Sequence, residues 1–195
     1  MKRVAITGGI GSGKSTLCRV LAERHPIAIY DSDRRAKEIM NSDPQVREGI
    51  VALFGSEAYT PEGLNRGHIA SRAFSDPTLL SQLNGVVHPR VVADFEEWAE
   101  GESGDYVIVE SALLFSSPLV GHYDLAVVVD APLELRVERC VARDGLSPKQ
   151  VRERISRQMS AEEMRSRADI VVVADGRPLE PLADHIDQAI RQLKK

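Results

Sequence analysis

The chain has 195 residues, of which 43% are hydrophobic and 28% charged, and its formal net charge is −4. This length suits one α/β domain with a small insertion and is too short for two full domains. The charge calls for neither nucleic acid nor an anionic membrane as a partner, and Cys18 and Cys140 lie outside any zinc-ligand or disulfide pattern. No apolar run approaches the ~18 residues of a membrane span, and the start does not resemble a signal peptide. We therefore expect a cytoplasmic protein with no obligate protein partner.

The chain opens with a short apolar run at residues 4–6, which leads into a pair of glycines, Gly8 and Gly9. A short apolar run that meets glycines is typical of a buried parallel strand followed by a tight turn. From Lys14 onward, apolar residues recur three and four positions apart, which predicts a helix.

The turn matches the pattern G-x-x-x-x-G-K-[ST] in full, with a strand before it and a helix after it. Glycines let the backbone N–H groups of such a loop point at an anion, and the helix adds the positive end of its dipole. We expect Lys14 to reach the β- and γ-phosphates of ATP, Ser15 to ligate Mg²⁺ and Thr16 to contact the α-phosphate. The residues assigned to nucleotide binding are Gly8, Gly9, Gly11, Ser12, Gly13, Lys14, Ser15 and Thr16.

This loop predicts a nucleotide site without choosing an activity. The Asn-Lys-x-Asp sequence with which a GTPase reads guanine does not occur in the chain. A motor or transporter ATPase needs an apolar run that ends in adjacent acidic residues, and the partial matches end in single acids, Glu110 and Asp130. Either acid could hold a Mg²⁺-bound water or cap the next helix; both readings stay open for Glu110, and the cap is favoured for Asp130. A small-molecule kinase fits best. The alternatives are a kinase for a nucleoside monophosphate or a sugar, and a nucleotide-dependent switch protein.

A second short strand is expected at residues 27–30, followed by Asp31-Ser32-Asp33 and a helix over residues 34–40. Ligands of parallel α/β sheets bind at the carboxyl ends of the strands. If this strand lies near the first one, Asp31 and Asp33 face the γ-phosphate. Asp31 is the better helix cap, so Asp33 is our candidate for the residue that orients and deprotonates an acceptor hydroxyl.

Residues 41–104 contain no convincing strand and read as a helical insertion. Three further apolar runs, at residues 106–109, 125–129 and 170–173, predict strands, and an amphipathic helix is expected over residues 179–193. Short apolar runs without strict alternation suit strands that are covered on both sides. We therefore predict an α/β fold with a five-stranded parallel sheet and helices on both faces.

A basic segment at residues 131–167 carries nine Arg or Lys and six Asp or Glu in a chain that is acidic overall. It reads either as a solvated helical hairpin or as a lid that closes over phosphates. Arg139 and Arg143, four residues apart, share one helix face, where they could stabilise a transferring phosphoryl group or simply pair with Glu138 or Asp144.

Taken together, these motifs resemble the dephospho-CoA kinase family in order and spacing along nearly the whole chain. Besides the phosphate loop and the Asp-x-Asp pair, the resemblance is carried by Gly63-Leu64-Asn65-Arg66 with Phe74, Leu83-Asn84, His88-Pro89, Arg139, Arg143-Asp144-Gly145, Arg154 and Gln158. It implies a P-loop kinase of the nucleoside-monophosphate-kinase type. Its core would comprise residues 1–40 and 105–195, with a lid at about 132–167 and an acceptor-binding helical insertion at 41–104.

The resemblance also implies roles for individual residues. Asp33 becomes the presumed catalytic base, with Asp31 beside it at the acceptor. Arg66, His88 and Pro89 belong to the helical part that receives dephospho-CoA. Arg139 and Arg143 become lid residues over ATP, so that the residues expected to act in catalysis are Lys14, Asp33, Arg139 and Arg143.

The reaction implied is the transfer of the γ-phosphate of Mg-ATP to the ribose 3′-hydroxyl of dephospho-CoA. Two segments depart from the family pattern. The family usually has Pro-Leu-Leu-x-Glu after the third strand, where this chain has Ala112 and Ser116 in place of the proline and glutamate. After the fifth strand, where an Asn-Asn-Gly sequence is common, the chain has Ala174-Asp175-Gly176.

Overall fold

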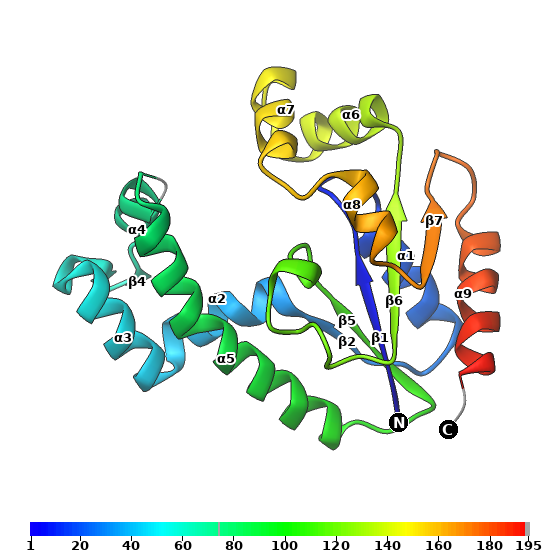
Figure 1. Cartoon of the computed structure of the whole chain (residues 1–195), viewed down its shortest axis with the longest axis horizontal. Helices are drawn as coiled ribbons and strands as arrows, with labels where there is room; N and C mark the ends of the chain where they lie inside the picture. The colour runs from blue at the N-terminus through cyan, green and yellow to red at the C-terminus, as the bar shows by residue number, and fades with distance from the viewer. Residues whose placement is uncertain (74, 194–195) are drawn as a thin grey trace. The chain divides into compact units, whose positions relative to one another are not determined.

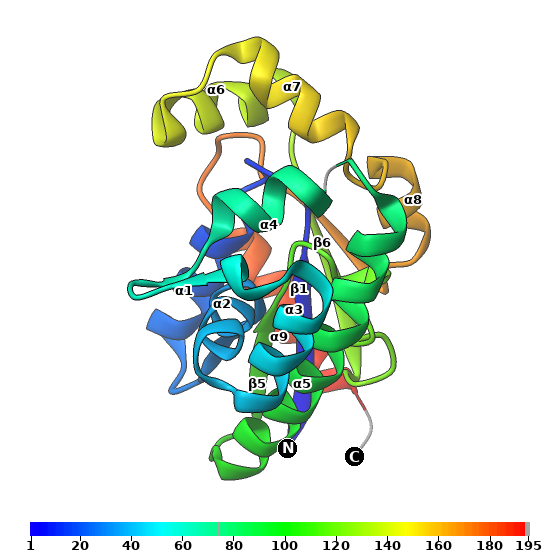
Figure 2. The same ribbon diagram turned by 90° about the vertical axis from the view of Figure 1, so that its left-hand side faces the viewer.

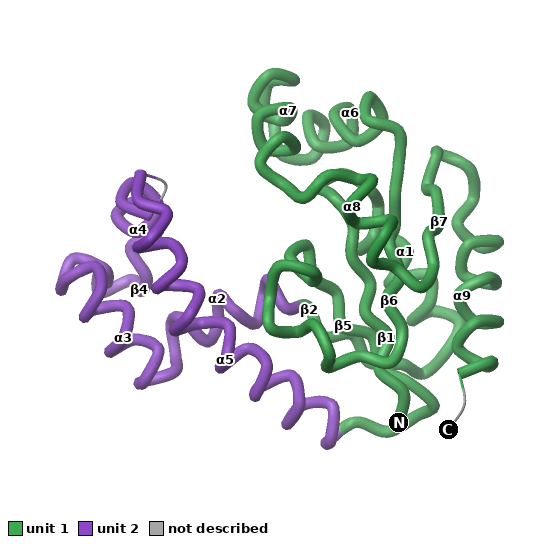
Figure 3. The backbone as a smooth tube through the Cα atoms, in the orientation of Figure 1, with its two compact units in different colours: residues 1–31, 102–195 green, residues 32–101 purple. Residues whose placement is uncertain are grey.

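A computed structural model describes residues 1–73 and 75–193, so Phe74 of the family motif lies outside the described residues. The contacts within the chain define two compact units (Figure 3). The first comprises residues 1–31 and 102–195, and the second residues 32–101. The boundary on contacts falls before helix α2 (Ser32–Ser42) because α2 packs on α3 (Pro44–Phe54) and α5 (Pro77–Gly101). The domain boundaries at 40, 41, 104 and 105 stay predictions.

The first unit is built on a five-stranded parallel sheet in the order β2-β5-β1-β6-β7, which confirms the predicted fold class. The strands are β1 (Lys2–Thr7), β2 (Ile29–Asp31), β5 (Tyr106–Glu110), β6 (Leu125–Asp130) and β7 (Ile170–Val173). Strand β2 starts two residues later than predicted because only Ile29–Asp31 pair with β5. Strand β2 is separated from β1 by β5, so the second strand of the chain is not the neighbour of the first.

Helices α1 (Lys14–Arg24) and α9 (Glu180–Gln192) contact each other and share one core with the sheet. Leu17 and Leu21 of α1 and Ile186 of α9 are fully buried in this core. Figures 1 and 2 show α1 and α9 on the same side of the sheet. On the opposite side, α8 (Ala161–Ser166) contacts β6. Every residue of β6 is buried, as expected for a strand between two layers.

Helices α6 (Leu133–Asp144) and α7 (Pro148–Ser156) form the predicted helical hairpin and run side by side in both views (Figures 1 and 2). Gly145 ends α6 in the left-handed conformation, and Ser147 starts α7 with a capping box. A small core of Val137, Cys140 and Val151 joins the two helices, and Ile10 of the phosphate loop packs against it. The hairpin and the loop therefore share buried apolar surface.

The second unit is mainly helical: it comprises α2, α3, α5 and a further helix, α4 (Arg66–Ala73). In α5 the buried residues recur every four positions through Leu83, Val87 and Val91, which gives the helix one apolar face. The prediction that this segment has no strand is wrong in one detail. Tyr59–Thr60 and Gly63–Leu64 form a two-stranded antiparallel hairpin, β3 and β4, whose strands are too short to show any periodicity.

Among the described residues there are also two 3₁₀ turns, Ser56–Ala58 in the second unit and Leu114–Ser116 in the first. None of the described helices combines the length and the apolar character that crossing a membrane requires.

Candidate active site

The loop between β1 and α1 is held by its own backbone and by a left-handed glycine at the start of the helix. Gly13 is the N-cap of α1 with φ 98°, a backbone conformation that residues with a Cβ rarely adopt. Ser12 N donates to Gly9 O at 3.0 Å, which closes the turn before the helix begins. The predicted order of strand, phosphate loop and helix is therefore present in the structure.

Two glycines of the loop are required by α6 rather than by the phosphate alone. A Cβ built on Gly11, whose φ is +76°, would lie 2.4 Å from the backbone oxygen of Arg136 and 2.9 Å from Cys140 Sγ. A Cβ built on Gly9 would lie 2.1 Å from Arg136 Nη2. At Gly11 the loop thus approaches the backbone of α6 more closely than a residue with a Cβ permits, whereas at Gly9 a Cβ would displace the guanidinium of Arg136.

Arg136 and Gln158 hold the same residue of the loop from two sides. Arg136 Nε donates to Ile10 O at 3.0 Å, and Ile10 N donates to Gln158 Oε1 at 2.9 Å. Arg136 Nη2 also lies 3.4 Å from Gln158 Oε1. Gln158 was part of the family motif, whereas Arg136 was not among the predicted site residues. The sequence contains no signal for this role, because the burial of Arg136 and its approach to the glycines are visible only in the structure.

Arg139 lies one helical turn further along α6 and binds backbone carbonyls. Its Nη1 donates to Gly11 O and Ser12 O at 3.3 and 3.2 Å, and its Nη2 donates to Ala174 O at 3.2 Å. The residue predicted to reach over ATP therefore also ties the phosphate loop to the segment after β7. Ala174, one of the departures from the family pattern, takes part through its backbone.

Arg143 forms a double hydrogen bond with Asp144, from Nε to Oδ1 at 2.7 Å and from Nη2 to Oδ2 at 2.9 Å. These bonds hold the pKa of the Asp144 carboxyl below its ordinary value. Arg139 and Arg143 both line a cavity of about 510 Å³ whose other walls are the loop, the start of α1 and residues 174–179. The cavity brings together the predicted phosphate loop and the two predicted arginines.

At the end of β5, Glu110 meets the two residues that complete the phosphate loop. Ser15 Oγ donates to Glu110 Oε1 at 2.5 Å, and Lys14 Nζ lies 3.9 Å from the same oxygen. Glu110 pairs in register with Ile6 of β1, which places it beside the loop. Its carboxylate therefore contacts the loop and does not cap a helix.

Asp130, for which a helix cap was favoured, has a different partner. Its Oδ1 accepts from Ala131 N at 2.9 Å, and its Oδ2 binds Arg165 Nε at 3.0 Å and Arg165 Nη2. The N-cap of α6 is Pro132, and no side chain bonds to that cap. The cap interpretation is wrong because Arg165 of α8 engages this buried carboxylate.

Asp31 and Asp33 are separated by the unit boundary. Asp31 ends β2 in register with Glu110, so it lies at the carboxyl edge of the sheet, one strand further from the loop than expected. Asp33 is exposed in the first turn of α2, in the second unit. The order of the strands thus places Glu110, and not Asp31, on the strand next to the loop.

The remaining predicted acceptor residues lie in the second unit. Arg66 is the exposed first residue of α4, and His88 and Pro89 lie in the interior of the 25-residue helix α5. His88 lies within α5 and does not begin it. It is half-buried, and this burial lowers its pKa.

A second cavity of the first unit, of about 320 Å³, adjoins the end of β1. Ala112 and Ser116, which replace the usual proline and glutamate of the family, line it together with Thr7, Gln158 and Met164. These two departures from the family pattern thus line the same cavity as Gln158, which binds Ile10 of the phosphate loop. At the other departure, the Asp175 carboxylate accepts from Arg177 Nε and lies outside these contacts.

Comparisons with known proteins agree on one family. Residues 2–180 match the family model described as dephospho-CoA kinase (CoaE). The chain is 42% identical to the dephospho-CoA kinase of Bacteroides fragilis strain YCH46 over 181 residues, which cover 92% of this chain and 88% of that protein. It is 41% identical to the dephospho-CoA kinase of Deinococcus radiodurans over 196 residues, which cover 99% of this chain and 93% of that protein.

Solved structures resemble the chain over almost its full length. A crystal structure of a Thermus thermophilus protein has a TM-score of 0.83 at 35% identity and covers 100% of this chain and 98% of its own. The dephospho-CoA kinase from Campylobacter jejuni has a TM-score of 0.68 at 22% identity, with 97% and 98% covered. Because the sequence identity to the Campylobacter jejuni enzyme is only 22%, this comparison shows a shared fold and nothing more.

Proposed function

The chain belongs to the dephospho-CoA kinase family, and on that premise we propose how its own residues divide the work of phosphoryl transfer. The reaction moves the γ-phosphate of ATP to dephospho-CoA and gives CoA and ADP, the last step of CoA biosynthesis. The observation that carries this conclusion is the family match over residues 2–180, with an intact phosphate loop between β1 and α1.

We assign the triphosphate to the cavity of about 510 Å³ at the loop. Lys14 contacts the β- and γ-phosphates and Thr16 the α-phosphate, while the loop N–H groups and the N-terminus of α1 attract the anion. Arg139 and Arg143 line the same cavity and neutralise charge on the transferring group. Arg143 then exchanges Asp144 for a phosphate oxygen.

The oxygen donors beside the loop fit Mg²⁺. The Ser15 hydroxyl and the Glu110 carboxylate meet at 2.5 Å, and Mg²⁺ is commonly held by few protein oxygens together with phosphates and waters. When bound, the ion neutralises charge on the phosphates. We assign Ser15 as its protein ligand and Glu110 as the residue that orients the Ser15 hydroxyl.

We assign the acceptor to Asp33 and to residues of the second unit. Asp33 is an exposed carboxylate at the start of α2, where it orients the ribose 3′-hydroxyl and accepts its proton. Asp31 contacts the same ribose. Arg66, His88 and Pro89 bind the remainder of dephospho-CoA, Arg66 through a phosphate. The family match supports this assignment, and we place the reaction in the cytoplasm, where ATP is abundant.

The test is ADP release by the purified chain with Mg-ATP, with and without dephospho-CoA, and mass detection of the product. We expect one CoA for each ADP, and only when the acceptor is present. Lys14→Ala is the matched variant, and it should lose most of the transfer because the phosphates lose their direct positive charge. Tight ATP binding without CoA formation would overturn the assignment of the acceptor, and CoA formation by Lys14→Ala at the normal rate would overturn the role of Lys14.

A further inference from the structure

Arg136 is a buried cation at the phosphate loop. The residue is 8% exposed, and its guanidinium donates hydrogen bonds to Ile10 O and Gln158 Oε1. Both partners are neutral oxygens. Among the residues that the structure describes, no carboxylate lies within ion-pair distance of this guanidinium.

Asp130 raises the pKa of Arg136, but burial has the larger effect and lowers it below its ordinary value. The Asp130 carboxylate is bound to Arg165 and to Ala131 N. Arg136 therefore keeps a positive charge, because a guanidinium does not lose its proton in proteins, and no carboxylate of the described residues is bonded to it. A buried charge without a bonded counter-ion is costly, so the site favours an anion near this guanidinium.

The position of this charge is set by the loop itself. Gly9 has no side chain, and the guanidinium occupies the space that a Cβ would need, with Nη2 at 2.1 Å and Cζ at 2.7 Å from that position. Gly9 is not in the left-handed region, so its backbone conformation does not demand glycine. The presence of glycine at this position is explained by Arg136.

Gln158 completes the arrangement from the segment that follows α7. Its side-chain oxygen accepts from Ile10 N, while Arg136 donates to the carbonyl of the same residue. Ile10 also packs its side chain into the small core between α6 and α7. The backbone N–H, the carbonyl and the side chain of Ile10 are thus all held by this part of the chain.

We infer that Arg136 and Gln158 are a pair of positioning residues for the triphosphate: they hold residues 9 and 10 of the loop in the phosphate-binding shape, and Arg136 supplies a buried charge that the bound phosphates neutralise. This inference rests on the proposed nucleotide site at the loop. It assigns the pair to nucleotide affinity and leaves the acceptor to other residues.

The first test is a double-mutant cycle on ADP affinity, measured by calorimetry without any turnover. Arg136→Ala should weaken ADP binding about tenfold or more, as expected for a charge-assisted interaction. Gly9→Ala should weaken it similarly, because the new methyl group expels the guanidinium. The double variant should bind like Arg136→Ala alone, since the space is then free. Multiplied effects in the double variant would overturn the explanation of Gly9.

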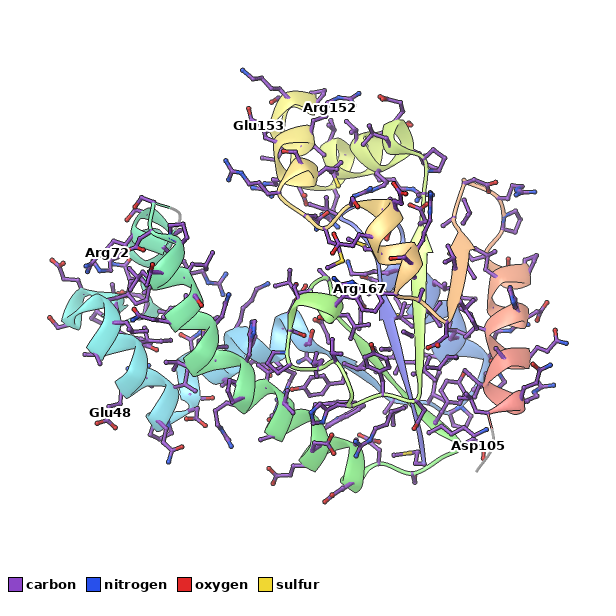
Figure 4. The ribbon with its side chains drawn as sticks, in the orientation of Figure 1. Glu48, Arg72, Asp105, Arg152, Glu153 and Arg167 are labelled. Atoms are coloured by element: carbon purple, nitrogen blue, oxygen red, sulfur yellow. The ribbon has the colours of Figure 1, made fainter. Side chains whose placement is uncertain are left out.

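The second test separates charge from fold through Arg136→Gln, which retains an N–H donor for Ile10 O. Without ligand, its thermal midpoint should equal or exceed that of the wild type, because a buried uncompensated charge is gone. With inorganic pyrophosphate, its midpoint should rise less than that of the wild type. Arg152→Gln is the control, since Arg152 pairs with Glu134 on the exposed side of the hairpin and is labelled on α7 in Figure 4.

In steady-state kinetics Arg136→Gln and Gln158→Leu should raise KM for ATP while KM for dephospho-CoA stays unchanged. If the wild type binds ADP and Arg136→Gln binds it equally well, the inference is overturned and the nucleotide site stands. If the wild type itself binds no nucleotide, both the inference and the proposed function are overturned. An equal rise of both KM values would show a general loss of structure and would also overturn the positioning role.

Discussion

Single residues at the phosphate loop have more than one task. Gly11 is needed both for its positive φ and for the approach of α6, and Arg139 both lines the nucleotide cavity and ties the loop to Ala174. The sequence pattern predicted the identity of the loop residues from phosphate chemistry alone. It did not predict that a neighbouring helix imposes the same residues, because contacts between distant segments leave no local periodicity.

Asp33→Asn should lower turnover by about 10²- to 10⁴-fold, because the amide cannot accept the proton of the acceptor hydroxyl. ADP affinity should stay near that of the wild type, because Asp33 belongs to α2 and not to the loop. Single-turnover CoA formation at saturating substrates, with calorimetry for ADP, checks both parts. Undiminished turnover would remove Asp33 from its proposed role.

His88 should make the chain more sensitive to acid. Burial lowers the pKa of His88 below its ordinary 6.5, so the unfolded state binds a proton more readily than the folded state. Stability therefore falls as the pH drops through about 6.5 and levels off below the folded pKa. Thermal midpoints at pH 7.5 and 5.5 should differ less for His88→Gln than for the wild type. Equal differences in the two proteins would contradict the effect.

At the scale of elements, the basic segment at residues 131–167 was predicted as a solvated helical hairpin or a lid, and it contains the two helices α6 and α7. Its relation to the loop was not predicted. Arg136 and Arg139 bind loop carbonyls, and Ile10 enters the core of the hairpin. These contacts make α6 a support of the loop. Charge counting showed that the segment is basic, but it could not show which arginines turn inward.

The same substitution should act with opposite sign at two helix positions. Gly145 ends α6 with φ +66° and Gly85 lies within α5, and a Cβ at either position meets nothing within 4 Å. Gly145→Ala should destabilise the chain by about 1 kcal/mol through the left-handed conformation, whereas Gly85→Ala should stabilise it by about 0.5–1 kcal/mol through helix propensity. Chemical denaturation of both variants beside the wild type measures the two shifts. Shifts of the same sign would show that packing decides at one of the positions.

For the whole molecule, the sequence was sufficient for the five-stranded parallel sheet, because its strands are buried and continuous in apolar residues. It did not predict the strand order, in which β5 separates β2 from β1. That order depends on how a long connection returns to the sheet, and a single sequence contains no local signal for it. The β-hairpin of β3 and β4 was not predicted because strands of two residues are too short to show a hydrophobic pattern.

Binding of ADP should slow amide hydrogen exchange in the phosphate loop and in the helical hairpin of α6 and α7 together. Because Ile10 is fixed by Arg136 and Gln158, slower opening at the loop should extend to the backbone of α6 and to the segment after α7. Hydrogen exchange with and without ADP should show added protection at residues 8–20 and 136–158. Protection limited to residues 8–20 would show that the hairpin opens independently.

The strand order also defines what the second unit is in topological terms. Strands β2 and β5 are parallel neighbours, and the second unit, residues 32–101, makes up all but the last four residues of the connection between them (Figure 3). Parallel neighbours need such a crossover, for which a single helix is usually enough. Here the crossover forms a compact unit of its own, and the backbone connects it to the first unit at two points, one at each end of residues 32–101. Its length and contents can therefore change over evolution without altering the register of any strand.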